Sequence, residues 1–363
     1  MLMEISIIIY LIIYFLVIIM LKNKKPNKIK VVILAILLGF FAGMRYKVGT
    51  DFSAYVYLYK DNVDLNFFDW LNRFRIDKIG LSFYLIIQLA KFMGGVNYFF
   101  GISAFLMSYF TLKGIIEEYP DISYKLATFI FLMTNFTNGL NGIRQYVAAS
   151  ICFLSLKYVY RKKIISFILM IIFASTMHIT AICFLPIYIF WDETKKDLIF
   201  NKKVITGLVG AFFVVLYYKQ FLLLIGGRFA NYSSDIVNSR NLTFYLMLTW
   251  FVIFLCLYKK ITQKNNKYKL LIVMYFIGLL CQYLGFISPA VARIGIYFNY
   301  PSFLLIAKIP DLFSNKYKKI IVCFLILYII LSFVFIYGIA KQSNIIPYRT
   351  KIITNKILNN EFK

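Results

Sequence analysis

Residues 29–51, IKVVILAILLGFFAGMRYKVGTD, place a long apolar run directly before a cluster of charged side chains. Arg45, Lys47 and Asp51 follow the run closely, which is typical of a membrane helix that ends at the lipid–water interface. Thr50 and Asp51 can cap a turn or present a carboxylate to a ligand. The plainer interpretation of this stretch is an arginine that anchors the helix at the interface beside a helix cap. The functional interpretation is that these polar residues form part of a binding or catalytic site.

Apolar runs of this kind recur along the chain. Of its 363 residues 61% are hydrophobic and only 15% are charged, a composition that excludes a soluble globular domain. The runs cover residues 2–21, 29–44, 79–93, 98–112, 124–136, 146–160, 164–176, 179–190, 204–225, 242–258, 270–287, 294–307 and 320–340. Several are shorter than the roughly 20 residues of a perpendicular span, which suggests re-entrant or broken helices. We predict an all-α polytopic protein of the cell (plasma) membrane, one domain over residues 1–363, with about 12–13 transmembrane or re-entrant helices.

Basic loops set the predicted orientation. The net charge of +26 gathers in short loops, and the positive-inside rule explains it without a nucleic-acid partner. We expect these loops in the cytoplasm: residues 22–30, 161–163, 195–203, 259–269 and 308–319. An odd number of apolar runs separates the first two loops, although a return to the same side needs an even number of crossings. Either one of the runs 79–93, 98–112 and 124–136 does not cross fully, or residues 54–71 hide a crossing.

This orientation brings ionisable side chains together on the outward side: Arg45, Arg144, Arg228, Arg293 and the sole histidine, His178. A charge in hydrocarbon costs at least ~2.5–3.5 kcal/mol on insertion scales, so such groups usually line a substrate or ion path. Plainer roles remain open for each of them. Arg228 can anchor the interface, Arg293 can neutralise a carboxylate, and a lone histidine is often structural. Residues 65–78 have the pattern of an amphipathic helix on the membrane surface.

Short motifs in a fixed order span nearly the whole chain. They are Gly43-Met44-Arg45-Tyr46, Val48-Gly49-Thr50-Asp51 and Tyr55, then Gly142-Ile143-Arg144-Gln145 with Ala148 and Ala149, then Ala174-Ser175-Thr176-Met177-His178-Ile179-Thr180-Ala181 with Pro186, then Gly227-Arg228-Phe229-Ala230-Asn231-Tyr232, Arg293-Ile294-Gly295-Ile296-Tyr297-Phe298 and Pro347-Tyr348. This ordered set resembles the EpsG family of Wzy-type polysaccharide polymerases. The resemblance implies extracytoplasmic assembly of capsule, exopolysaccharide or O-antigen from repeat units carried on undecaprenyl diphosphate. It also implies a fold similar to the GT-C glycosyltransferases.

The implied reaction expels undecaprenyl diphosphate from an anomeric carbon, and arginine suits that leaving group. A guanidinium binds phosphate oxygens in pairs, remains charged, and stabilises the charge that develops on the diphosphate. We expect Arg144 and Arg293 to carry this role first, and then Arg45 and Arg228.

The acceptor hydroxyl must lose its proton to a nearby base. A group that titrates near neutral pH or a carboxylate can take it, and His178 and Asp51 are the outward candidates. The residues expected to bind the sugar or to orient these groups are Gln145, Tyr55, Tyr232 and Thr50.

No metal or other cofactor is expected. The aspartate-pair metal motif of nucleotide-sugar glycosyltransferases is absent from the sequence, and one histidine without clustered acids gives poor ligand spacing. The cysteines lie within apolar runs without CxxC spacing and are expected to pack. Expected partners are the lipid-linked oligosaccharide, membrane lipid, a chain-length regulator and a flippase.

Two other functions use the same arginines. An O-antigen ligase or another lipid-linked glycosyltransferase would differ only in its acceptor, which sequence does not reveal. A flippase or transporter of lipid-linked oligosaccharide would bind the diphosphate without chemistry, and internal repeat symmetry, which would favour it, is not evident.

Overall fold

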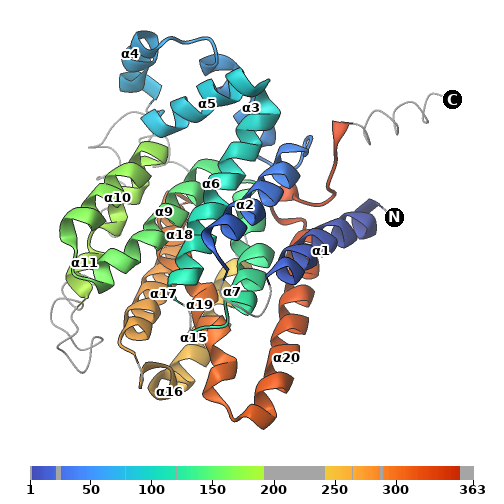
Figure 1. Ribbon diagram of the computed structural model, residues 1–363, viewed down its shortest axis with the longest axis vertical. Helices are drawn as coiled ribbons and strands as arrows, with labels where there is room; N and C mark the ends of the chain where they lie inside the picture. The colour runs from blue at the N-terminus through green and yellow to red at the C-terminus, as the bar shows by residue number, and fades with distance from the viewer. Residues whose placement is uncertain are drawn as a thin grey trace.

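The computed structural model describes residues 2–21, 26–77, 79–118, 121–191, 242–263, 265–286 and 289–351, and the regular elements there are helical (Figure 1). The first half contains α1 (Leu2–Met20), α2 (Lys28–Gly43), α3 (Phe52–Asn62), α4 (Phe67–Asp77), α5 (Leu81–Met93), α6 (Val96–Glu117), α7 (Tyr124–Phe131), α8 (Thr137–Gly139), α9 (Ile143–Tyr160), α10 (Ile164–Met177) and α11 (Ile187–Phe190). The second contains α15 (Leu242–Cys256), α16 (Tyr258–Thr262), α17 (Lys267–Leu284), α18 (Pro289–Asn299), α19 (Ser302–Lys308) and α20 (Asn315–Phe333). Two π-helices, η1 (Leu132–Phe136) and η4 (Val334–Ile339), and the 3₁₀-helices η2 (Ile179–Phe184), η3 (Ile309–Leu312) and η5 (Gln342–Asn344) complete it.

The helices follow the predicted apolar runs closely. Among the described residues four helices are long and apolar enough to cross a membrane, or up to five if a bent pair counts as one span. That pair joins α18 to residues 302–312 with a bend of 46°, so the run 294–307 is a broken helix, as expected for some of the short runs. The run 204–225 lies outside the described residues. The structure confirms an all-α polytopic membrane protein.

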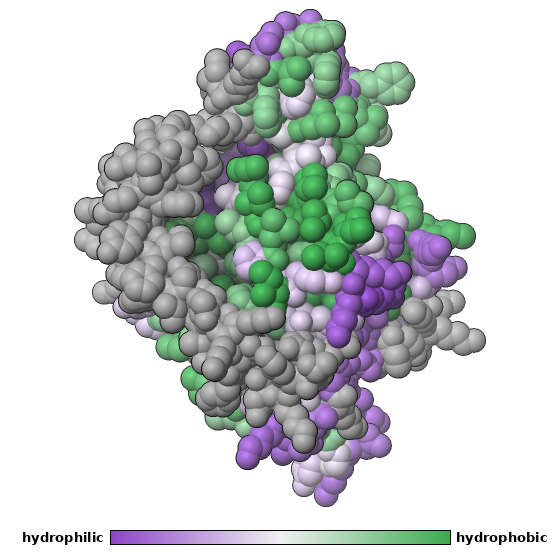
Figure 2. Space-filling view, turned by 90° about the vertical axis from the view of Figure 1, so that its left-hand side faces the viewer, coloured by the Kyte–Doolittle hydropathy of each residue, from purple (hydrophilic) through white to green (hydrophobic). Residues whose placement is uncertain are grey.

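The outer surface is apolar where a soluble protein would be polar. Ile19, Phe40 and Phe92 are 76%, 70% and 89% exposed. Figure 2 shows a broad area of hydrophobic side chains on the face it presents, with hydrophilic residues at its upper end and toward its lower end. Such a surface is stable in lipid and would aggregate in water.

Glycines bring α2 against α6. A Cβ at Gly39 would lie 2.8 Å from the carbonyl oxygen of Gly101, and one at Gly43 would lie 3.0 Å from the carbonyl oxygen of Asn97. Gly39 and Gly43 are spaced as small residues are at close membrane-helix contacts. The end of α2 therefore lies beside the beginning of α6.

Helix α5 begins and ends at one end of the bundle. Near its start, the Ser82 and Thr176 hydroxyls are 2.6 Å apart, which places it beside the end of α10. It is followed directly by α6, which begins beside the end of α2. Figure 1 shows α3, α4 and α5 gathered at this end. The run 79–93 is therefore the one that does not cross fully, and the even number of crossings between residues 30 and 161 is restored.

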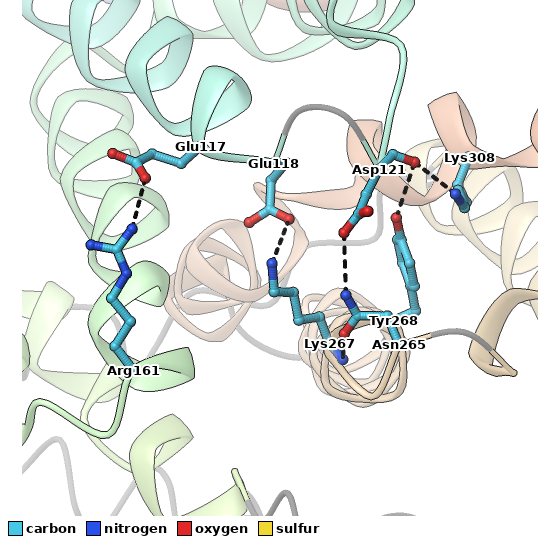
Figure 3. A network of polar contacts seen from close by, with 8 residues as sticks. All are labelled: Glu117, Glu118, Asp121, Arg161, Asn265, Lys267, Tyr268 and Lys308. Atoms are coloured by element: carbon cyan, nitrogen blue, oxygen red, sulfur yellow. Dashed lines mark hydrogen bonds and ion pairs between the residues drawn. The ribbon is translucent and has the colours of Figure 1, made fainter.

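The opposite end of the bundle holds a network of acids and bases (Figure 3). Glu117 pairs with Arg161 at 3.1 Å and Glu118 with Lys267 at 3.6 Å. Lys308 donates to the carbonyl oxygen of Asp121 at 2.6 Å. The basic partners come from the loops 161–163, 259–269 and 308–319 or from their edges, so these three predicted cytoplasmic loops lie at one end of the molecule.

The glycine contact predicts a stability effect. Gly39→Ala places a methyl group against a backbone oxygen that cannot rotate away, and overpacking of this kind costs about 1–3 kcal/mol. We expect a lower thermal unfolding midpoint for the purified protein in detergent. Gly338→Ala is the matched control, since its Cβ meets Ile7 Cδ1 at 3.4 Å, an ordinary contact. Equal midpoints for the two variants would contradict close α2–α6 packing.

The acidic network predicts a pH effect. Burial raises the pKa of Glu118 above its usual range, against the opposing charge of Lys267. The folded protein therefore binds this proton more tightly than the unfolded chain does, and stability falls as pH rises from the unfolded-state pKa through the folded-state pKa. Glu118→Gln should flatten that fall in unfolding midpoints measured from acid to neutral pH. An unchanged slope would show that Glu118 titrates as an ordinary carboxyl.

Candidate functional site

A cavity of about 850 Å³ lies between α3, α9, α15, α18 and the two π-helices. Seven of the residues singled out from sequence line it: Thr50, Asp51, Tyr55, Arg144, Gln145, His178 and Arg293. Arg228 and Tyr232 lie outside the described residues. Side chains from distant parts of the chain thus share one hollow.

Arg144 lies on the first turn of α9, where three contacts hold it. Its backbone N–H donates to the Tyr55 hydroxyl at 3.5 Å, and its Nε donates to the carbonyl oxygen of Met177 at 3.4 Å. The guanidinium carbon lies 4.8 Å from the centre of the Phe83 ring, a cation–π contact. These contacts orient the guanidinium at the cavity wall.

Arg293 reaches the same cavity from α18. Gln145, the residue after Arg144, donates through Nε2 to the carbonyl oxygen of Arg293. The bond joins α9 to α18, so the two arginines are carried by helices that are tied together. The Arg293 side chain is exposed, whereas Gln145 is buried.

His178 lies in the break between α10 and η2, outside both helices, and two hydroxyls meet its ring. Nδ1 is 2.6 Å from Thr180 Oγ1 and 3.2 Å from the Tyr297 hydroxyl, and these hydroxyls are 3.0 Å apart. Burial, with the positive charges of Arg144 and Arg293, lowers the pKa of His178 to about 3. The imidazole is therefore neutral at physiological pH.

Asp51 is placed by the loop before α9. Asn141 Oδ1 accepts from the backbone N–H of Asp51 at 2.9 Å and from the Thr50 hydroxyl at 3.1 Å. Gly49 has a φ of +98°, and a Cβ there would lie 2.9 Å from the same Asn141 oxygen. Glycine is needed for this backbone conformation. The C-terminal segment holds the loop too, because Thr50 N–H donates to the carbonyl oxygen of Ser343 at 2.9 Å.

Arg45 does not line this cavity. It is 2% exposed, its guanidinium lies 4.5 Å from the centre of the Phe100 ring, and it donates to the carbonyl oxygen of Leu140. Its backbone forms a bridge to Thr350. These contacts join α2, α6, the loop before α9 and the C-terminal segment, which is a structural role next to the site.

Sequence reasoning missed part of the site. Asn138 and Asn141, which positions Asp51, lie just before the motif that contains Arg144, but an amide gives no signal of its own. Thr180 and Tyr297 belong to the quoted motifs, but the sequence assigned them no role. Only the structure shows that their hydroxyls form hydrogen bonds with His178 Nδ1. In the part of the chain that the structure describes, no group of three His, Cys, Asp or Glu side chains is close enough to hold a metal ion.

The two ends of the bundle predict a labelling pattern in a cysteine-free variant expressed in cells. Cysteines introduced at Thr50 or Arg293, both exposed at the site end, should react with a membrane-impermeant maleimide from outside the cell. Cysteines at Lys162 or Lys316, exposed in the basic loops, should react only after permeabilisation. Labelling of Thr50→Cys and Arg293→Cys from different sides would contradict a shared cavity.

One comparison with known proteins identifies a family. The sequence profile of the EpsG family matches residues 28–350, which is nearly the whole chain and includes every candidate residue. No curated protein and no solved structure matches the chain. The chain belongs to the EpsG family, whose members are Wzy-like polysaccharide polymerases.

Proposed function

We propose that this protein is a glycosyltransferase that polymerises oligosaccharide repeat units carried on undecaprenyl diphosphate, at the extracytoplasmic side of the plasma membrane. The observation that carries the proposal is the meeting of Arg144, Arg293 and His178 at one cavity in the membrane-embedded bundle. Guanidinium groups bind phosphate oxygens in pairs and stay charged, so two arginines at one cavity fit an anionic ligand such as a diphosphate.

The arginines hold the leaving group in this proposal. The acceptor hydroxyl oxygen attacks the anomeric carbon of the donor sugar, and the bond from that carbon to the diphosphate oxygen breaks. The electron pair stays on the diphosphate, whose charge Arg144 and Arg293 stabilise. Because Gln145 ties the two helices together, this pair is preorganised and need not be assembled by the substrate.

His178 or Asp51 receives the acceptor proton. A general base works best when its pKa lies near the operating pH, and the two arginine charges oppose protonation of His178. A bound diphosphate would offset those charges and raise the basicity of the imidazole. Donor binding would in this way prepare His178 for the second substrate, while Asp51, which lines the same cavity, is the alternative base.

Arg144→Ala and His178→Ala should each abolish long polysaccharide chains while protein levels stay normal. Arg144→Lys should also fail, since an ammonium cannot bind two phosphate oxygens through a planar fork. The readout is the chain-length distribution of purified protein incubated with a defined lipid-linked repeat and analysed by gel. Arg73→Ala is the matched control, because Arg73 pairs with Asp61 at 2.9 Å and does not line the cavity. Wild-type chain length in Arg144→Ala would remove this residue from the site.

Deletion of the gene distinguishes a polymerase from the other two candidate functions, a flippase and a ligase. Loss of a polymerase should leave single repeat units exposed on the cell surface, whereas loss of a flippase should trap them inside. A ligase would transfer finished chains to a different acceptor, and it would not lengthen the defined lipid-linked repeat in the purified reaction.

A further inference from the structure

The cavity extends well beyond its arginines. Asn299 and Tyr300 also line it, and they lie about two helical turns past Arg293, roughly 10 Å further along the α18 axis. The acidic and basic residues among the described lining residues are Asp51, Arg144, His178 and Arg293, so the part of the cavity around Asn299 and Tyr300 has no charged side chain. Its polar groups are amides and hydroxyls.

Both π-helices of the described chain contribute to this deeper wall. Asn135 belongs to η1, Asn138 to the short helix α8 that follows η1, and Tyr337 to η4. The Tyr337 hydroxyl donates to Asn138 Oδ1 at 2.8 Å, which joins η4 to α8 across 199 positions of sequence. A π-helical turn is rare, is less favourable than an α-turn and often occurs at functional sites.

We call Asn135, Asn138, Tyr146, Asn299 and Tyr337 the amide wall. Asn135, which lines the cavity, donates from Nδ2 to the carbonyl oxygen of Tyr300 at 2.7 Å, and this bond fixes the amide. Asn299 Oδ1 is buried and has no hydrogen-bond partner among the described residues. A buried amide oxygen without a donor is costly, and a ligand hydroxyl would satisfy it.

The polar groups of the amide wall suit one part of a lipid-linked repeat unit better than the others. A diphosphate needs cations, which the wall lacks, and a polyprenyl chain would bury these amides without partners. Sugar hydroxyls both donate and accept, as amides and phenols do, and the aromatic residues Trp250 and Tyr275 line the same cavity. We propose that the amide wall binds the uncharged oligosaccharide of the repeat unit, while the arginine end binds its diphosphate. This inference rests on the proposed function.

Binding of two probes to the full-length protein tests the amide wall and the arginine end separately. The protein is in detergent for the first probe and in nanodiscs for the second. The first is the oligosaccharide repeat released from the source cell's own polysaccharide, without lipid or phosphate, and the second is undecaprenyl diphosphate. Tyr337→Phe and Asn299→Leu should each weaken oligosaccharide binding about 5–10-fold and leave undecaprenyl diphosphate binding unchanged. Arg144→Ala should do the reverse.

Tyr14→Phe is the matched control for Tyr337→Phe. The Tyr14 hydroxyl bonds Thr137 at 2.7 Å, next to Asn138, but Tyr14 does not line the cavity, so oligosaccharide binding should stay at the wild-type level. Unchanged oligosaccharide binding in both wall variants, or equal loss of both probes, would overturn the amide wall. Wild-type protein that binds undecaprenyl diphosphate but not the oligosaccharide would overturn this inference alone, whereas failure to lengthen a lipid-linked repeat would overturn the proposed function.

Discussion

A polar group inside a lipid bilayer must find its partner within the protein, because hydrocarbon offers none, and this constraint organises the whole molecule. Arg45 satisfies this constraint with a hydrogen bond to the carbonyl oxygen of Leu140, and Tyr14 does so with a hydrogen bond between its hydroxyl and that of Thr137. Gln145 donates a hydrogen bond to the carbonyl oxygen of Arg293. Each of these bonds joins segments far apart in sequence, so satisfying polar groups also fixes how the helices pack.

The same constraint explains why the remaining polar side chains gather around one cavity. A hollow inside the bundle can hold water or a hydroxyl-bearing ligand, which the lipid-facing surface cannot. Arg144 and Arg293 therefore lie at the cavity with His178, rather than on the outer faces of their helices. The acids and bases of Figure 3 lie at the other end, where Glu118 and Lys267 pair at the edge of the bundle. The separation leaves the middle of the outer surface apolar.

Broken and irregular helices make room for the cavity. The bend of 46° after α18 and the π-helix η1 both interrupt apolar runs that would otherwise be continuous. Each interruption exposes backbone or turns an amide such as Asn135 toward the hollow. Membrane proteins tolerate such irregular backbone where it lines a protein cavity, and the same breaks would be costly against lipid.

The sequence by itself determined the helical class, the apolar helices of the described chain, and seven of the residues that line the cavity, since hydropathy and the scarcity of charge in lipid are local properties. It also indicated that some short runs are broken. Only the tertiary structure decided that α5 does not cross, that Arg45 is buried away from the cavity, and that Asn141, Tyr297 and the amide wall belong to the site. The reason is physical: whether a side chain meets a hollow, a backbone oxygen or another helix depends on contacts between distant segments, which no local pattern contains.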